Sequence, residues 1–168
     1  EYSAVDDIDF SPDGKFIASA TKNTTPRIWE VETGKLIHEL KGHQKPVISI
    51  AYSKDGKYIY TSGNDATIIA WDSFSGKKLT KTSGHEDNVS SISVSPDWTH
   101  FVTSSADKTV RLWNAENGLE FSDPKGRHKE IMYAFDLSDD GKILAMGGPD
   151  STLSIWNAQT GELITNYP

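Results

Sequence analysis

Three histidines precede three aspartates in this sequence at one fixed distance along the chain. The pairs are His43 with Asp65, His85 with Asp107, and His128 with Asp150, and each pair is separated by 22 residues. An imidazole beside a carboxylate is a common arrangement for a general base, and both groups are frequent zinc ligands. Acid–base catalysis and metal binding are therefore the first chemistries to weigh.

The other features of an enzyme or a metal site are missing from the sequence. The histidines are His38, His43, His85, His100 and His128, and no two of them are two or four residues apart, as ligands on one strand or helix would be. There is no Gly-x-Ser-x-Gly, no glycine-rich phosphate loop and no cysteine nucleophile. We expect no catalytic residue, no metal and no cofactor.

The histidine and aspartate pairs belong to a longer repeat, which four tryptophans mark. Trp29, Trp71, Trp113 and Trp156 are 42, 42 and 43 residues apart. Each closes a similar run of sequence: IASATKNTTPRIWE, IYTSGNDATIIAWD, FVTSSADKTVRLWN and LAMGGPDSTLSIWN. A repeat of about 40–45 residues indicates units that bury their apolar faces only by stacking on neighbours. The chain is therefore predicted to be an array.

Each copy of the repeat is predicted to contain four strands joined by tight turns. Asp-Gly and Thr-Gly or Ser-Gly steps separate stretches of alternating apolar and polar residues, which is the hairpin pattern. The expected strands are 5–10, 15–20, 26–30 and 35–40; 47–52, 57–62, 67–72 and 77–82; 89–94, 99–104, 109–114 and 118–122; and 131–137, 142–147, 152–157 and 161–165. No helix is needed to account for the sequence.

These features resemble the WD-repeat β-propeller family over essentially the whole chain. The motifs that carry the resemblance are Gly42-His43, Gly84-His85, the turn aspartates and Trp71-Asp72, whereas the third histidine follows a displaced glycine in Gly126-Arg127-His128. The resemblance implies an all-β propeller of four-stranded antiparallel blades. We expect one WD-repeat region over 1–168, with blades at about 5–40, 47–82, 89–122 and 131–165.

The resemblance also implies a structural role for the histidine and aspartate pairs. In this family the loop histidine, a strand hydroxyl, the turn aspartate and the tryptophan N–H form a buried hydrogen-bond chain within each blade. The matching sets here are His43, Thr61, Asp65 and Trp71; His85, Thr103, Asp107 and Trp113; and His128, Asp150 and Trp156, with Met146 at the hydroxyl position. The first copy has Ser19, Asn23 and Trp29 without a histidine. These residues are expected to support the fold rather than to react.

The four copies of the repeat do not decide whether this chain closes into a complete ring. Propellers have about 4–8 blades, and members of this family commonly have about seven. Glu1 is not an initiator residue, and no outer strand or Gly-His loop precedes the first inner strand. We therefore expect part of a larger propeller, with further blades from the same chain. A self-sufficient four-blade ring and a pairing of two copies into one ring are the alternatives.

Composition limits the cellular compartments and the classes of partner that we expect. The chain has no cysteine, no apolar stretch of the roughly 20 residues that span a membrane, and a formal net charge of −7. Its longest basic run is Lys77-Lys78, whereas a nucleic-acid groove needs a basic stripe. We expect an intracellular protein, cytoplasmic or nuclear, that binds neither nucleic acid directly nor membranes. The acidic surface mildly favours basic peptides, although solubility alone explains it more simply.

Two sets of residues are candidates for binding partner proteins. Loops at the channel entrance of the resembling family correspond here to positions that include Lys45, Asn64, Asn88 and Lys129. On the opposite face, Trp98 replaces a turn glycine and Phe74 replaces a polar residue of the sister copies, and large aromatics in turns often mark contact sites. We expect a patch of Trp98 and Phe74, with Lys77 and His100 on its rim. Packing of Trp98 onto its own blade is the competing explanation.

The sequence is therefore interpreted as a non-catalytic scaffold that holds partner proteins or peptides on propeller faces within a multiprotein assembly. One alternative is a propeller enzyme with a site at the central channel. Another is a purely architectural subunit whose blades complete a larger assembly. The fold by itself does not choose among these functions.

Overall fold

A computed structural model describes residues 4–95, 97, 99–122, 134–138, 140–148 and 151–168 of the chain. Trp98, His128, Lys129 and Asp150 lie outside the described residues. The predicted fourth-copy strand 131–137 is described only from residue 134 onward.

The described chain folds into strands that form four antiparallel sheets, each of which we number as a blade. Blade 1 contains β1 (Val5–Phe10), β2 (Phe16–Thr21), β3 (Arg27–Glu30) and β4 (Leu36–Glu39). Blade 2 contains β5 (Val47–Tyr52), β6 (Tyr58–Gly63), β7 (Thr67–Asp72) and β8 (Lys78–Ser83). Blade 3 contains β9 (Val89–Val94), β10 (His100–Ser105), β11 (Val110–Asn114) and β12 (Glu120–Ser122). Blade 4 contains β13 (Ala134–Leu137), β14 (Ile143–Gly147), β15 (Leu153–Asn157) and β16 (Leu163–Tyr167).

The sheets confirm the predicted all-β class. Strands follow one another in chain order across every sheet, and no helix occurs in the part of the chain that the structure describes. The second strand of each copy begins one residue later than predicted. In the first copy the N–H of Lys15 donates to Asp13 Oδ1 at 3.1 Å, so Lys15 belongs to the turn and pairing resumes at Phe16.

The turn glycines behave as the Asp-Gly pattern predicts. Gly14 and Gly56 have φ values of 71°, and Gly141 has 70°, which is the left-handed region that glycine enters cheaply. Beside each of these turns a serine hydroxyl donates to the turn aspartate, as Ser11 does to Asp13 at 2.7 Å. The hairpins are therefore specified locally, before any blade packs on another.

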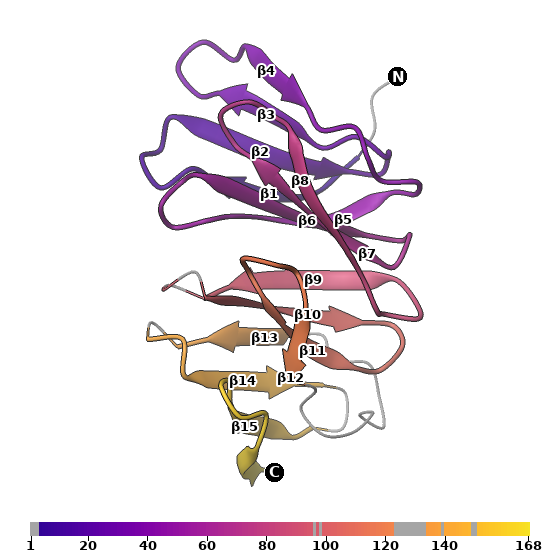
Figure 1. Ribbon diagram of the computed structural model, residues 1–168, viewed down its shortest axis with the longest axis vertical. Coiled ribbons are helices and arrows are strands. Elements are labelled where there is room, and N and C mark those ends of the chain that lie inside the picture. The colour runs from indigo at the N-terminus through magenta and orange to yellow at the C-terminus, as the bar shows by residue number, and fades with distance from the viewer. Residues whose placement is uncertain (1–3, 96, 98, 123–133, 139, 149–150) are drawn as a thin grey trace.

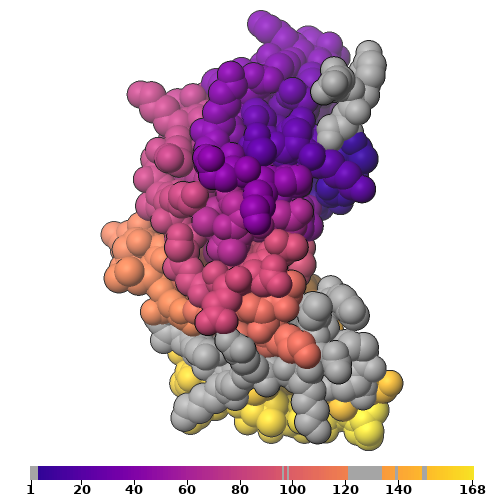
Figure 2. Space-filling view, turned by 90° about the vertical axis from the view of Figure 1, so that its right-hand side faces the viewer, coloured from indigo at the N-terminus to yellow at the C-terminus, as the bar shows by residue number. Residues whose placement is uncertain are grey.

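The four blades stack one on another, from the first at one end of the molecule to the fourth at the other (Figure 1). The inner strand β1 lies beside β5, and β5 lies beside β9. Figure 2 shows the elongated outline that results, with the indigo first blade and the yellow C-terminal segment at opposite ends. The apolar core lies mainly between blades: one cluster joins Ala18 and Ile28 of blade 1 to Ile50 of blade 2.

Two carboxylates tie the inner strand of blade 1 to that of blade 2. Asp7 Oδ2 accepts the hydroxyl of Ser49 at 2.8 Å and the N–H of Ile50 at 3.0 Å. Asp9 Oδ2 accepts the N–H of Tyr52 at 2.7 Å, and burial raises the pKa of Asp9 above its ordinary value. These side chains satisfy backbone donors of β5 that no strand pairs on that side.

The outward face of blade 1 is exposed where the same face of blade 2 is buried. Ile8 and Phe10 are 54% and 51% exposed, whereas Ile50 and Tyr52, their sister residues in the repeat, are 3% and 8% exposed. Blade 1 covers Ile50 and Tyr52 as part of a shared core cluster. The face that carries Ile8 and Phe10 is thus built like a blade interface.

Candidate functional site

In blade 2 the predicted residues form one continuous hydrogen-bond chain. His43 lies in the loop before β5, and its Nδ1 is 3.0 Å from Asp65 Oδ1. Its Nε2 is 2.8 Å from the Oγ1 of Thr61 in the middle of β6. The indole N–H of Trp71 on β7 donates to the same Thr61 oxygen at 2.9 Å. A loop, two strands and a turn are joined through four side chains.

Blade 3 repeats this chain with the sister residues. His85 Nδ1 is 2.9 Å from Asp107 Oδ2, and its Nε2 is 2.7 Å from Thr103 Oγ1. Trp113 Nε1 donates to Thr103 Oγ1 at 2.7 Å. The repeat period therefore places equivalent groups at equivalent points of both blades.

The turn between β6 and β7 holds the aspartate in position. Asp65 Oδ2 accepts the N–H of Gln44 at 2.8 Å, and Oδ1 accepts the hydroxyl of Thr67 at 2.7 Å. Ala66, the next residue, has a φ of 60°, which is a left-handed conformation that costs a non-glycine residue about 1 kcal/mol. The network thus holds a strained backbone position in place.

Burial and hydrogen bonding determine the charge states in the network. The side chain of His43 is fully buried, and this desolvation lowers the pKa of His43 in spite of the neighbouring Asp65 carboxylate. Burial acts to raise the pKa of Asp65, but hydrogen bonds from Gln44, Thr67 and His43 outweigh it and leave that pKa below its ordinary value. At neutral pH an uncharged His43 therefore faces an ionised Asp65.

This charge state matches every donor in the chain with an acceptor. The Nδ1–H of neutral His43 points to the Asp65 carboxylate, and its bare Nε2 accepts the Thr61 hydroxyl, whose oxygen receives the Trp71 N–H. The imidazole has no nitrogen left for a substrate. The two pairs that the structure describes, His43 with Asp65 and His85 with Asp107, are thus engaged within their blades. Among the described residues, no group of three or more histidine, aspartate or glutamate side chains is arranged to hold a metal.

The first and fourth blades carry altered versions of the chain. In blade 1 the N–H of Trp29 donates to Ser19 Oγ at 3.2 Å, and the hydroxyl of Thr21 donates to Asn23 at 2.8 Å. In blade 4 the buried Met146 occupies the position of Thr61. His128 and Asp150, which were predicted to complete this set with Trp156, lie outside the described residues.

The first set of predicted partner-binding residues is only partly accessible. Lys45 is exposed, whereas Asn64 and Asn88 are half-buried. The N–H of Asn64 donates to Pro46 O at 2.9 Å, so the loop after β6 is bonded to the residue that precedes β5. Lys129 of the same predicted set lies outside the described residues.

Of the second set, the structure places Phe74 and Lys77 at one hairpin and buries His100. Phe74 is 73% exposed and Lys77 is exposed at the same hairpin of blade 2. His100 is instead buried, and its Nε2 is 3.0 Å from the carbonyl oxygen of Gly141 in blade 4. Contrary to expectation, His100 therefore does not lie on an exposed rim, because packing of blade 3 on blade 4 covers it. Trp98 lies outside the described residues.

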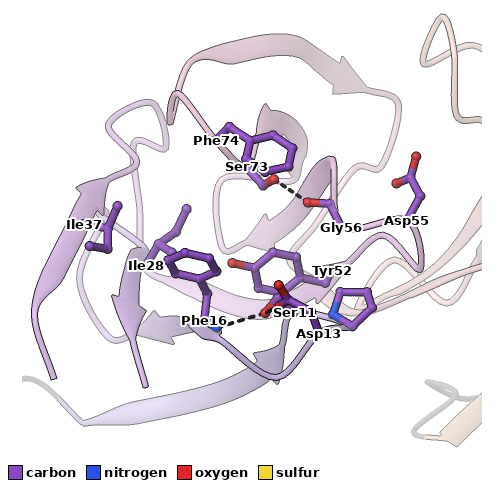
Figure 3. A pocket seen from close by; sticks show the side chains of 11 residues that line it. Ser11, Asp13, Phe16, Ile28, Ile37, Tyr52, Asp55, Gly56, Ser73 and Phe74 are labelled. Carbon is purple, nitrogen blue, oxygen red and sulfur yellow. Dashed lines mark hydrogen bonds between the residues drawn. The ribbon is translucent and has the colours of Figure 1, made fainter. Parts of the chain in front are cut away.

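A pocket of about 210 Å³ lies between blades 1 and 2, and the sequence did not indicate it (Figure 3). We name it the Phe74 pocket. Its lining includes the apolar side chains of Phe16, Ile28, Ile37, Tyr52 and Phe74 and the carboxylates of Asp13 and Asp55. Each residue is ordinary in its own strand or turn, and only the stacking of the blades brings them together. The replacement of a polar residue by Phe74 was the one sequence signal near it.

The part of the chain that the structure describes contains no helix of a length and apolarity that would cross a bilayer. The model of one protein family, described as the NWD2 C-terminal β-propeller, matches residues 2–168 of this chain.

Known proteins resemble shorter stretches of the chain. The general transcriptional corepressor TUP1 of Saccharomyces cerevisiae is 42% identical over 41 residues, which are 24% of this chain and 6% of that protein. The meiotic recombination protein rec14 of Schizosaccharomyces pombe is 46% identical over 44 residues, which are 26% of this chain and 15% of that protein. The WD repeat-containing protein 26 homolog of Arabidopsis thaliana is 46% identical over 46 residues, which are 26% of this chain and 8% of that protein.

Each of these matches spans about one repeat and a small part of the relative. The family model, in contrast, extends over four sheets, two of which, blades 2 and 3, contain the complete hydrogen-bond chain of WD repeats. The chain belongs to the WD-repeat β-propellers, in the family of NWD2 C-terminal β-propellers.

Proposed function

We propose that this chain is a non-catalytic platform that holds partner proteins or peptides on its propeller faces within a multiprotein assembly. The main support is that the buried histidine side chains already form hydrogen bonds within their own blades. His43 and His85 are buried, and both of their ring nitrogens lie within hydrogen-bond distance of residues of their own blades. These imidazoles stabilise the blades, and the exposed loops and turns are left for binding.

The proposed partners are proteins rather than nucleic acids or membranes. A net charge of −7 repels the phosphate backbone and anionic lipids. Two relatives are named as a transcriptional corepressor and a meiotic recombination protein, and these processes take place inside the cell. Both names support a platform that works in the cytoplasm or the nucleus.

The platform function is tested by affinity capture of the full-length protein from its own cells, with quantitative mass spectrometry of what is retained. Lys45→Glu on one face and Lys77→Glu on the other are matched variants, because both lysines are exposed and the charge change is the same. We expect defined protein partners, and we expect one variant to lose partners that the other retains. Absence of any protein partner from the wild-type capture would contradict the platform.

A second proposed role is architectural: the outward face of blade 1 packs against a further blade, from the same chain or from a second copy. The observation that favours it is the exposure of Ile8 and Phe10, whose sister residues Ile50 and Tyr52 are buried by the preceding blade. Two exposed apolar side chains on a face built like a blade interface indicate an unfilled contact.

Light scattering combined with small-angle X-ray scattering tests this second role on the 168-residue chain. We expect a dimer or larger assembly, and we expect Ile8→Lys with Phe10→Lys to convert it to a monomer. Exchange of the exposed Lys22 and Lys35 for glutamate is a control that should leave the assembly unchanged. A compact wild-type monomer would count against packing on a second copy.

A further inference from the structure

We propose that the Phe74 pocket receives one large apolar side chain of a partner peptide that carries a lysine or arginine next to it. This inference rests on the platform function and adds to it a particular site and a chemical class of ligand. It is carried by the size of the pocket, by one unpaired hydroxyl inside it and by the charges at its mouth.

The pocket is large enough for one side chain and is mostly apolar. Its volume of about 210 Å³ exceeds the roughly 150 Å³ of an engineered apolar cavity that binds benzene. Ile28 and Tyr52 are buried in its wall, and Phe74 stands exposed at its mouth (Figure 3). A leucine, phenylalanine or tryptophan side chain would gain apolar contacts on several sides and would cover Phe74.

The hydroxyl of Tyr52 points into the pocket toward Ile28 and Phe16 (Figure 3). The Tyr52 side chain is only 8% exposed, and no described residue forms a hydrogen bond with the hydroxyl, although the Tyr52 N–H is bonded to Asp9. The hydroxyl oxygen is not among the fully buried polar atoms, so solvent reaches it through the pocket, and the carbonyl and N–H groups of a bound peptide can take the place of that solvent. The pocket therefore contains a polar group placed for a ligand.

The charged residues that line the pocket are both acidic. Asp13 and Asp55 come from the first hairpins of blades 1 and 2, and lysine and arginine are missing from the described lining. Lys15 and Lys57 pair with these carboxylates, but both lysine side chains are more than half exposed. Exposed pairs of this kind contribute little, so a cation of the peptide can share or replace them. A basic residue beside the inserted side chain complements the mouth of the pocket.

The equivalent crevice between blades 2 and 3 has different residues at the positions that form the mouth of the Phe74 pocket. Its lining has Glu116 at the position of Phe74 and Ala115 at the position of Ser73. Tyr60, which corresponds to the small Ala18 of blade 1, also lines this second crevice. An aromatic side chain at the Phe74 position therefore distinguishes the junction of blades 1 and 2 from that of blades 2 and 3, and the second crevice serves as an internal control.

The test is selection of a phage-displayed library of random linear peptides on the wild-type protein, followed by affinity measurement on variants. Phe74→Glu introduces the sister residue at an exposed position, and Tyr52→Phe removes only the unpaired hydroxyl. Tyr58→Phe, which removes a hydroxyl from the second crevice, is the matched control. Asp13→Asn with Asp55→Asn removes both charges and keeps an oxygen for the Ser11 and Ser53 hydroxyls. Circular dichroism melting verifies that each variant is folded.

We expect enriched peptides to share one large apolar residue with lysine or arginine close to it. Phe74→Glu should weaken their binding by about tenfold or more, and Tyr52→Phe by about threefold to tenfold. The double Asp→Asn variant should lose the preference for basic neighbours, and Tyr58→Phe should bind normally. Enrichment of acidic or wholly polar peptides, equal binding to Phe74→Glu, or no enrichment would overturn the proposal. If cellular partners are still captured in any of these cases, the platform function stands and only this site falls.

Discussion

His38 Nε2 lies 2.8 Å from the main-chain oxygen of Phe74, so the last strand of blade 1 holds the last hairpin of blade 2. The carbonyl oxygen accepts, and the imidazole nitrogen donates. The imidazole also packs on Gly76 of the same hairpin, where an added Cβ would lie 2.8 Å from His38 Cγ. This contact positions the residue that forms the mouth of the Phe74 pocket.

Replacement of Gly76 by alanine is expected to destabilise the protein more than replacement of Gly14. Both glycines have left-handed φ values, 67° and 71°, so both substitutions add about 1 kcal/mol of backbone strain. Only Gly76→Ala also collides with His38, because no atom lies within 4 Å of a Cβ at Gly14. Urea denaturation should show at least about 1 kcal/mol of extra loss for Gly76→Ala. In a His38→Ala background this difference should disappear, and its persistence would show that the collision is not its cause.

Removal of the Thr61 hydroxyl is expected to be costly, although valine has nearly the same shape. Thr61→Val leaves the Trp71 N–H and the His43 Nε2 buried without partners, which should lower the free energy of unfolding by about 2–4 kcal/mol. Thr61→Ser keeps the oxygen and should lose less than half of that amount. Chemical denaturation followed by tryptophan fluorescence measures both. Equal losses for valine and serine would mean that packing, not the hydrogen-bond chain, matters at this position.

Stability is expected to fall when the pH is lowered from 7 to 5. Burial lowers the pKa of His43 in the folded state. In the unfolded chain His43 has the ordinary histidine pKa of about 6.5, so below that pH the unfolded state binds the proton more readily than the folded state. The contribution of His43 is therefore complete above that pH and is lost as the pH falls toward the folded-state pKa. Buried His100, whose pKa is also lowered by desolvation, acts in the same direction.

Urea denaturation at a series of pH values measures this dependence. His43→Gln removes one titrating group and should give a shallower slope between pH 7 and 5, whatever its own stability. An unchanged slope in His43→Gln would contradict the assignment of the pH dependence to the blade network.

The turn after Asp65 is expected to gain stability from glycine. Ala66 has a φ of 60°, and glycine adopts this conformation without strain from a Cβ. Ala66→Gly should therefore raise the free energy of unfolding by up to about 1 kcal/mol, whereas the β-branched Ala66→Val should lower it. Thermal denaturation ranks the three proteins. A less stable glycine variant would show that strain at Ala66 is outweighed by the freedom that glycine adds to the unfolded chain.

The link from β1 to β5 is expected to depend on Asp7. Asp7→Ala removes the acceptor of the Ile50 N–H and the Ser49 hydroxyl, and should lower the free energy of unfolding by about 1–3 kcal/mol. The neighbouring Asp6 is exposed, so Asp6→Ala is the matched control and should have little effect. Hydrogen exchange should locate the loss of protection at the Ile50 amide. Similar effects of both variants would indicate that the change in net charge, rather than the lost contact, alters the free energy of unfolding.

The sequence alone determined what depends on local chemistry and on the repeat. Asp-Gly turns specified the hairpins, alternation specified the strands to within about two residues in most cases, and the Trp period specified four equivalent units. The network of His43 and Asp65 was implied by the resemblance to WD repeats, which these residues help to carry, and it recurs in blade 3 because equivalent points of the two blades hold the same residues. The strand edges shifted where a turn aspartate captured the next N–H, as at Lys15, which alternation alone does not report.

Only the tertiary structure decided what depends on one blade lying against the next. His100 was predicted on the rim of a partner-binding patch, but it is buried, and its imidazole lies against the Gly141 carbonyl of blade 4. The Phe74 pocket and the reach of Asp7 to Ile50 likewise join residues from different copies. The repeat says that units stack, but the fit of two particular surfaces depends on their individual side chains, and these are the residues in which the copies differ.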